Sequence, residues 1–333
     1  MSFELVLGPL RGVTLATFRA VLAGQSGGFD KAVAPFVPTV AGERIKPVLL
    51  KDVAMLSQSG MKIIPQVIGK DPAQLRAMLA AMAALGHSEV NLNLGCPWKF
   101  VIKKGRGCGL FADADNLRRM LDAGCEAMPG GFSVKLRLGL QDTGLLAERI
   151  PLLNQYPLAG ITVHPRTAAQ MYDGAVWLDE FAAVYRELLA PLTYNGDIFT
   201  PADFVGLQKR FPDISRWMIG RGAATDPFLA RTIRRTVGSD AKTAGTAQPT
   251  LAELRRFYDE IYARYRAELY GPASLLGRMK ELWGYLHERC EDGAKLLRQV
   301  RHCHKIDEYD RHVEAWFARV GRLAPVPSRI SLE

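Results

Sequence analysis

The sequence predicts a (β/α)8 TIM barrel followed by a small all-helical C-terminal domain. Up to about residue 235, short apolar runs alternate with helical patterns, which indicates a parallel sheet. Eight such runs occur, as a TIM barrel requires. From residue 251 to residue 322 the apolar residues keep helical spacing, and no convincing strand interrupts them. A doubly wound open sheet is the alternative, and both the number of strands and the chain length disfavour it.

Each element of the barrel is predicted from a local pattern of residues. Helix patterns lie between several strands, at 71–85, 113–124 and 201–210. Asp71 is a suitable N-cap with Pro72 at the first helical position, and Thr200 suits the start of the third helix. The predicted strands cover residues 5–7, 31–35, 63–67, 89–94, 133–138, 160–164, 192–194 and 217–219.

Composition divides the chain into four parts. We expect a barrel over residues 1–236, a linker over 237–250, a helical domain over 251–322 and a tail over 323–333. The linker reads VGSDAKTAGTAQPT, which is small, polar and contains Gly and Pro.

Composition and charge limit the class of protein. The chain has 333 residues, 48% of them hydrophobic, and a net charge of +9 from 43 basic and 34 acidic residues. The positive excess suits a polyanionic partner without requiring one. Five cysteines without a CxxC pair argue against a disulfide framework or a zinc ribbon and favour the cytoplasm. The N-terminus does not resemble a signal peptide, and no apolar stretch approaches ~18 residues, so we expect no membrane contact.

Polar residues follow most of the predicted strands, and they are the strongest sign of an enzyme. In a TIM barrel the active site lies at the C-terminal ends of the strands. Packing alone does not explain a series of Lys, His, Gln and Arg at that position. These strand ends are Gly8-Pro9, Gln66, Asn93 to Cys96, Lys135 to Arg137, His164, Asn195-Gly196-Asp197 and Gly220-Arg221-Gly222.

Cys96 is the candidate reactive group, because a strand delivers it to a Gly-Cys-Pro turn at the barrel mouth. A thiol there can act as a nucleophile or an acid, and a buried structural thiol is the alternative. The following loop, 98–109, is rich in Gly and carries four cations. We expect it to be a mobile lid that contacts phosphates, although a solvated loop would look the same. Its cations are Lys99, Lys103, Lys104 and Arg106.

Two further groups of strand-end residues indicate an anionic ligand. Lys135 and Arg137 share one face of a strand, so an inward Lys135 needs a partner such as a reduced flavin or Asp197. The ends of the seventh and eighth strands are the standard phosphate site of this fold, and their glycines allow close approach. We therefore expect a phosphorylated cofactor or substrate there.

In the C-terminal region Arg298, Arg301, His302 and Lys305 would share one helix face. These side chains would contact RNA or form a solvated face. The solvated face stays open because the residues after 250 are nearly balanced in charge, with 15 basic and 13 acidic side chains. His302 and His304 would point away from Cys303 on a helix, so we predict no metal site.

Seven motifs resemble the tRNA-dihydrouridine synthase family, in family order. They are GPLRGVT (8–14), PQVIG (65–69), NLNLGCPWK (91–99), SVKLRLG (133–139), ITVHPRT (161–167), YNGDI (194–198) and MIGRGA (218–223). The segment 278–300 is similar to bacterial members related to the position-16 enzyme. Leu10 stands where the family usually has Met, and Pro165 where it usually has Gly, which stiffens the turn that carries Arg166.

The resemblance implies FMN in the barrel mouth, NADPH as reductant, a tRNA uridine as substrate and tRNA contacts from the helical domain. We expect the protein to act as a monomer. Cys96 corresponds to the catalytic acid, and Asn93, Arg166 and Tyr172 would lie near the uracil. The positions that correspond to flavin contacts are Pro9, Leu10, Gln66, Lys135, His164, Asn195, Gly196, Asp197, Gly220 and Arg221.

The implied reaction is hydride transfer from flavin N5 to C6 of uracil, followed by protonation of C5 by Cys96. Lys135 would stabilise the anionic flavin. One alternative is a flavin enzyme for a free pyrimidine, similar to dihydroorotate dehydrogenase, which would need neither the basic loop nor the helical domain. The other is an RNA-binding protein without catalysis, against which Cys96, Lys135 and His164 argue.

Overall fold

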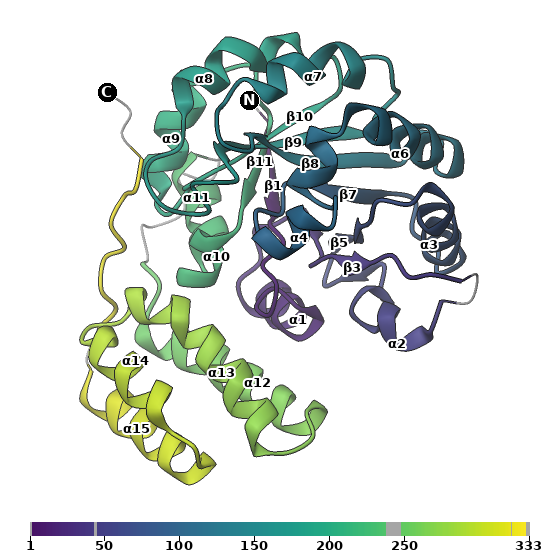
Figure 1. Cartoon of the computed structure of the whole chain (residues 1–333). Coiled ribbons are helices and arrows are strands. Elements are labelled where there is room, and N and C mark those ends of the chain that lie inside the picture. Colours follow the sequence, from purple (N-terminus) through teal and green to yellow (C-terminus); the bar gives the residue numbers. More distant parts are fainter. Residues whose placement is uncertain (1, 43–44, 238–247, 321, 331–333) are drawn as a thin grey trace.

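The computed structural model describes residues 2–42, 45–237, 248–320 and 322–330. Figure 1 shows a curled sheet with helices around it, and a further group of helices beside it at the C-terminal end of the chain. Within the described residues, no helix is long and apolar enough to cross a membrane.

The strands form one sheet in the order β3-β6-β7-β8-β9-β10-β11-β1-β2-β5-β4, in which only the β4–β5 pair is antiparallel. All eight predicted strands are confirmed, and the short β3 and β4 are additions. The strand bounds are β1 Glu4–Leu7, β2 Lys31–Val33, β3 Val37–Pro38, β4 Ser57–Gln58, β5 Met61–Ile64, β6 Gln66–Ile68, β7 Val90–Leu94, β8 Phe132–Gly139, β9 Gly160–Thr167, β10 Leu192–Asn195 and β11 Arg216–Ile219.

Pro65 closes the sheet into a barrel. It alone separates β5, which pairs with β2, from β6, which pairs with β7. Proline cannot donate to a ladder, but its carbonyl still accepts a hydrogen bond from the Asn91 N–H at 2.8 Å. β5 and β6 therefore serve as one strand, and eight parallel strands form a ring. The predicted TIM-barrel class is confirmed.

The predicted helix starts are also confirmed. The Asp71 side chain accepts a hydrogen bond from the Gln74 N–H at 2.9 Å, and Thr200 forms a reciprocal capping box with Asp203. The helix bounds are α1 Ala16–Gln25, α2 Pro47–Leu50, α3 Pro72–Ala84, α4 Lys99–Lys103, α5 Cys108–Ala112, α6 Ala114–Ala127, α7 Leu145–Leu153, α8 Leu178–Val184, α9 Pro201–Arg210, α10 Arg221–Thr225, α11 Leu229–Val237, α12 Leu251–Glu268, α13 Pro272–Leu286, α14 Gly293–His302 and α15 Ile306–Arg319.

The C-terminal region is helical, as predicted, and its core is continuous with that of the barrel. Phe18 of α1 meets Phe257 of α12 edge to face, with ring centroids 5.7 Å apart. At the centre of the bundle, the Tyr309 hydroxyl accepts a hydrogen bond from the Trp283 indole at 2.8 Å and lies 2.9 Å from the Tyr258 hydroxyl. Apolar packing thus fixes the helical region against the barrel.

The predicted linker lies mostly outside the described residues, which omit 238–247. The predicted tail runs back beside the barrel as the yellow segment in Figure 1. Ala324 pairs through its backbone with Arg289, and the Arg329 guanidinium lies 4.0 Å from the centroid of the Phe199 ring. The tail therefore connects the helical region to the barrel, while the proposed division into domains stays a prediction.

Candidate active site

A cavity lies at the C-terminal ends of the barrel strands and encloses about 850 Å³, part of it open to solvent. Because parallel strands end on the same side of a barrel, side chains distant in sequence converge there. Twelve of the predicted site residues line this cavity: Pro9, Leu10, Gln66, Asn93, Cys96, Lys135, His164, Tyr172, Asn195, Asp197, Gly220 and Arg221.

Asn93 fixes the turn that carries Cys96. Its side-chain oxygen accepts hydrogen bonds from the N–H groups of Gly95 at 3.1 Å and Cys96 at 2.9 Å. Its amide nitrogen donates to the Gln66 side chain at 2.8 Å, and Gln66 in turn donates to Asn91. This buried amide network spans β6 and β7 and holds the Cys96 thiol at the cavity wall.

Gly107 explains why the segment after Cys96 is folded. A Cβ atom at this position, where φ is 57°, would lie 2.8 Å from the Cβ of Cys96. Glycine therefore allows the chain to fold back over the Cys96 turn. The segment contains the short helices α4 and α5 on either side of residues 104–107, so the predicted loop is partly helical, while its mobility stays a prediction.

The thiol of Cys96 is held in its neutral form. Burial raises the pKa of Cys96, and this outweighs the opposite effects of the Trp98 backbone, Arg137 and Arg11. A neutral thiol is an acid that can donate a proton, whereas a thiolate would be a nucleophile. The environment thus suits Cys96 to proton donation.

Lys135 faces the cavity without a carboxylate partner among the described ion pairs, so the suggested pair with Asp197 is absent there. Burial, reinforced by Arg137, lowers the pKa of Lys135 to about 7. An anion in the cavity would raise this pKa again by favouring the ammonium form. Lys135 is therefore poised to take up a proton when an anionic ligand binds.

His164 lies opposite Arg137 in the register of β8 and β9, and it is neutral. Burial, followed by the charges of Arg137 and Lys135, lowers the pKa of His164 well below its usual value. Its Nε2 lies 3.1 Å from Nη1 of Arg166. Because a guanidinium only donates, Nε2 must accept, and the ring proton must lie on Nδ1.

Asp197 joins the ends of β9, β10 and β11. Its carboxylate accepts hydrogen bonds from both Arg166 and Arg221, including one from Arg166 Nη1 at 3.0 Å. Arg166 is 1% exposed and also donates to the Gly174 carbonyl at 2.6 Å. One carboxylate thus balances two arginines, and a buried pair of this kind is costly to disrupt.

Tyr172 lies close to two cations at the cavity mouth. Its ring centroid lies 5.3 Å from the guanidinium carbon of Arg137 and 4.9 Å from that of Arg221. A wider groove continues from this point toward α13, where Arg278, Glu281 and Tyr285 line it. The cavity therefore opens into a cleft between the barrel and the helical region.

The family model described as dihydrouridine synthase (Dus) matches residues 6–320. The chain belongs to the dihydrouridine synthase family. This confirms the resemblance predicted from the sequence motifs, and with it the assignment of the chain as an enzyme.

Curated members of the dihydrouridine synthase family match nearly the whole chain. The tRNA-dihydrouridine(16) synthase of Cupriavidus necator is 29% identical, covering 93% of this chain and 96% of its own. The protein of the same name from Ralstonia nicotianae is 30% identical, covering 90% and 95%. Among solved structures, morphinone reductase is similar with a TM-score of 0.49 at 12% identity, covering 69% of this chain and 85% of its own. That likeness is too distant to bear on function.

Nine of the predicted site residues do not line the cavity. Gly196 and Arg166 do not line the cavity, and neither do the predicted cations around α4 or those of the helical region. The predicted helix face is shorter than expected, because α14 ends at His302 and Lys305 lies in the turn before α15. These outer cations are exposed, except for Arg106, which is half-buried. They are Lys99, Lys103, Lys104, Arg106, Arg298, Arg301 and Lys305.

The structure also adds cavity residues that were not among the predicted site residues. Arg11, Phe36, Trp98 and Arg137 all line it. Arg137 is two residues from Lys135 on the same strand, so both side chains lie on the same face. This spacing could have identified Arg137 as a cavity residue. Phe36 and Trp98 follow strands as apolar residues, and nothing in the sequence distinguishes them from core residues.

Proposed function

We propose that this protein reduces a uridine of tRNA to 5,6-dihydrouridine, with bound FMN and with NADPH as reductant. The observation that carries the proposal is that one cavity is lined both by the buried Cys96 thiol and by Lys135, which has no carboxylate partner among the described ion pairs. Reduction of a uracil ring requires an acid that protonates the ring and a cation that stabilises the negative charge formed during hydride transfer.

The cavity residues fit a flavin phosphate by their chemistry. The lining has four cationic side chains, Arg11, Lys135, Arg137 and Arg221, against one carboxylate, Asp197. Such an excess favours a ligand that carries negative charge. Lys135, His164 and Gln66 would hold the ring system, and Arg221 with the adjacent Gly220 would hold the phosphate. Bound FMN would supply the hydride that is added to C6 of uracil.

Cys96 would complete the reaction by donating its proton to C5 of the same ring. The Asn93 amide would keep the thiol in place through the two N–H groups of the turn. Tyr172, at the mouth between Arg137 and Arg221, would stack on a base that leaves its helix. Unstacking a base costs a few kcal/mol, which contacts to the RNA backbone must offset.

The groove and the exposed cations support RNA over a free pyrimidine. The groove extends from the cavity mouth to α13, well beyond the size of a single base. Trp98 and Phe100 are 60% and 69% exposed beside Lys99 and Lys104, and the Lys104 ammonium lies 4.2 Å from the Phe100 ring centroid. Exposed aromatic rings interleaved with lysines are typical of surfaces that bind nucleic acid. The cations of α14 and α15 would extend these contacts.

Position 16 is the proposed target, since the relatives named above carry that position in their names. The test is to incubate the protein with NADPH and unmodified tRNA and to map dihydrouridine along the product. We expect modification at uridine 16, and none in a matched tRNA with cytidine there. Modification at another position would contradict the assignment of the site, and modification of free uridine alone would contradict the RNA substrate.

A further inference from the structure

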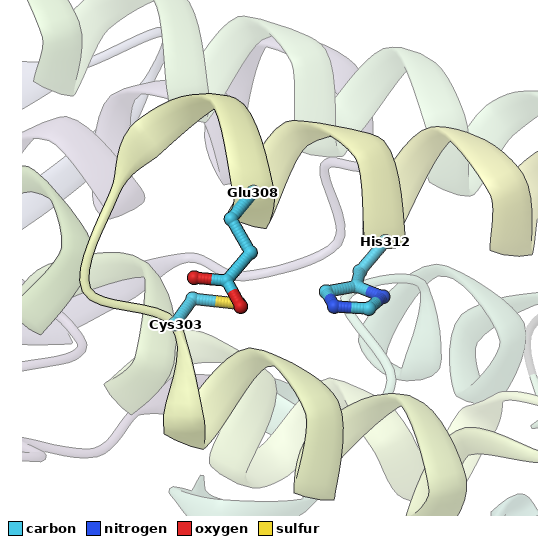
Figure 2. A group of neighbouring side chains, drawn as sticks. All are labelled: Cys303, Glu308 and His312. Carbon is cyan, nitrogen blue, oxygen red and sulfur yellow. The ribbon is translucent and has the colours of Figure 1, made fainter.

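Cys303, Glu308 and His312 form a cluster in the helical region, far along the chain from the barrel cavity. Their donor atoms, one thiol sulfur, one carboxylate oxygen and one imidazole nitrogen, all lie within 4.8 Å of one another. Figure 2 shows the three side chains converging from the turn after α14 and from the first turns of α15. We propose that these residues bind one zinc ion.

The backbone explains how the cluster forms. Glu308 and His312 are four residues apart on α15, so they lie one turn apart on the same helix face. Cys303 ends α14, and its backbone oxygen accepts a hydrogen bond from Lys280 of α13 at 2.6 Å. The backbone of Cys303 is therefore held by a neighbouring helix, while its thiol lies near the two donors of α15.

The donors of α15 are not used elsewhere in the described part of the chain. No ion pair or hydrogen bond found there includes the Glu308 carboxylate or the His312 ring, although exposed carboxylates elsewhere on α15 are paired, such as Glu314 with Arg255. Cys303 is a free thiol whose only hydrogen bond described is a 3.3 Å contact to the Gln299 carbonyl. Two partly buried donors and a buried thiol thus lie close together, and no hydrogen bond described joins them.

The donor set favours zinc over hard cations. Thiolate and imidazole are ligands that Zn²⁺ prefers, while Mg²⁺ and Ca²⁺ require sites made of oxygen atoms. Zinc bonds of ~2.0–2.3 Å place two ligands of one ion roughly 3.5 Å apart, so small side-chain movements would bring these donors to the ion. Three protein donors leave the fourth tetrahedral position for water.

Zinc binding would exchange one proton and would join two helices. Cys303 is a free thiol in this structure. The Zn–S bond replaces the S–H bond, and the proton leaves to solvent. The ion would connect α14, which carries Arg298 and Arg301, with α15, which Lys305 directly precedes. It would thereby stiffen this basic face.

The test is titration of the chelator-treated, full-length protein with Co²⁺, a spectroscopic substitute for zinc. We expect one ion per chain, a thiolate-to-cobalt absorption band, and tetrahedral bands at longer wavelengths than flavin absorbs. Cys303→Ser should remove the thiolate band, and His312→Gln should weaken Co²⁺ binding by at least about tenfold. Zn²⁺ should displace Co²⁺ and raise the melting temperature of the wild type.

Cys125→Ser is the matched control, because Cys125 is a partly buried free thiol on α6 of the barrel. Its bands should equal those of the wild type. If Cys303→Ser does not fold, His312→Gln decides the matter, since His312 is half-buried and makes no described hydrogen bond. The absence of cobalt bands in the wild type would overturn the proposal, as would equal bands in the wild type and His312→Gln.

Discussion

The side-chain oxygen of Asn93 accepts a hydrogen bond from the backbone N–H of Cys96 at 2.9 Å. The proposed acid is thereby held by a residue three positions earlier, at the end of the same strand. The sequence suggested that Asn93 contacts the uracil, but its amide oxygen and one amide hydrogen are already engaged within the protein. The main role of Asn93 in this structure is therefore to hold the turn that positions the Cys96 thiol.

Replacing Asn93 by Ala should therefore slow the oxidation of reduced enzyme by tRNA. The turn would lose the acceptor for two N–H groups, and a small displacement of a catalytic group costs up to about 100-fold. Rapid-mixing kinetics of flavin reoxidation would measure this rate. Asn91→Ala is the control, because Asn91 is buried in the same amide network but does not bond to the turn. Equal rates for the two variants would show that Asn93 does not position Cys96.

Lys135→Met should stabilise the metal-free and flavin-free protein, and the gain should depend on pH. The pKa of Lys135 is about 7 in the folded protein, against about 10.4 in an unfolded chain. Between these values the unfolded state binds the extra proton, so the wild type loses stability as pH falls. The gain from the substitution should grow from pH 10 to pH 7 and then level off. Denaturant unfolding at several pH values would measure it, and a gain that is constant with pH would contradict the lowered pKa.

Asp197→Asn should destabilise the protein strongly. It would leave the buried Arg166 without its counter-charge, and breaking a buried pair in this way costs about 3–5 kcal/mol. Asp213→Asn is the control, since the Asp213–Arg186 pair is exposed at 59% and 69%. That control should cost far less, because solvent screens an exposed ion pair. Urea unfolding would compare the free energy of unfolding of the two variants. Similar losses would mean that Asp197 does not stabilise the buried arginines.

The elements of the barrel could be predicted because their patterns are local. A strand that ends in a polar residue and a helix that begins with Asp71 or Thr200 show their signals within a few positions. The family motifs lie at these same places, which is why most predicted site residues line one cavity.

Other features depend on contacts between distant segments and could not be predicted. Arg166 is directed to Asp197 rather than into the cavity because β10 places that carboxylate beside β9. The helices after Cys96 form because Gly107 can approach Cys96 closely. Sequence spacing around Cys303 suggested no metal site, since the other donors belong to the next helix. The spacing of Glu308 and His312 was the signal that could have drawn attention to it.

The central claim is that reduced enzyme transfers its electrons to tRNA with Cys96 as the acid. The most direct test is to reduce the flavin-loaded protein with NADPH without oxygen, add unmodified tRNA, and follow the flavin absorbance. We expect the absorbance to recover as dihydrouridine forms, and we expect Cys96→Ala to slow this recovery by about 10²–10⁴-fold while reduction by NADPH is unchanged. Recovery at equal rates in both proteins, or reduced flavin that tRNA never reoxidises, would contradict it.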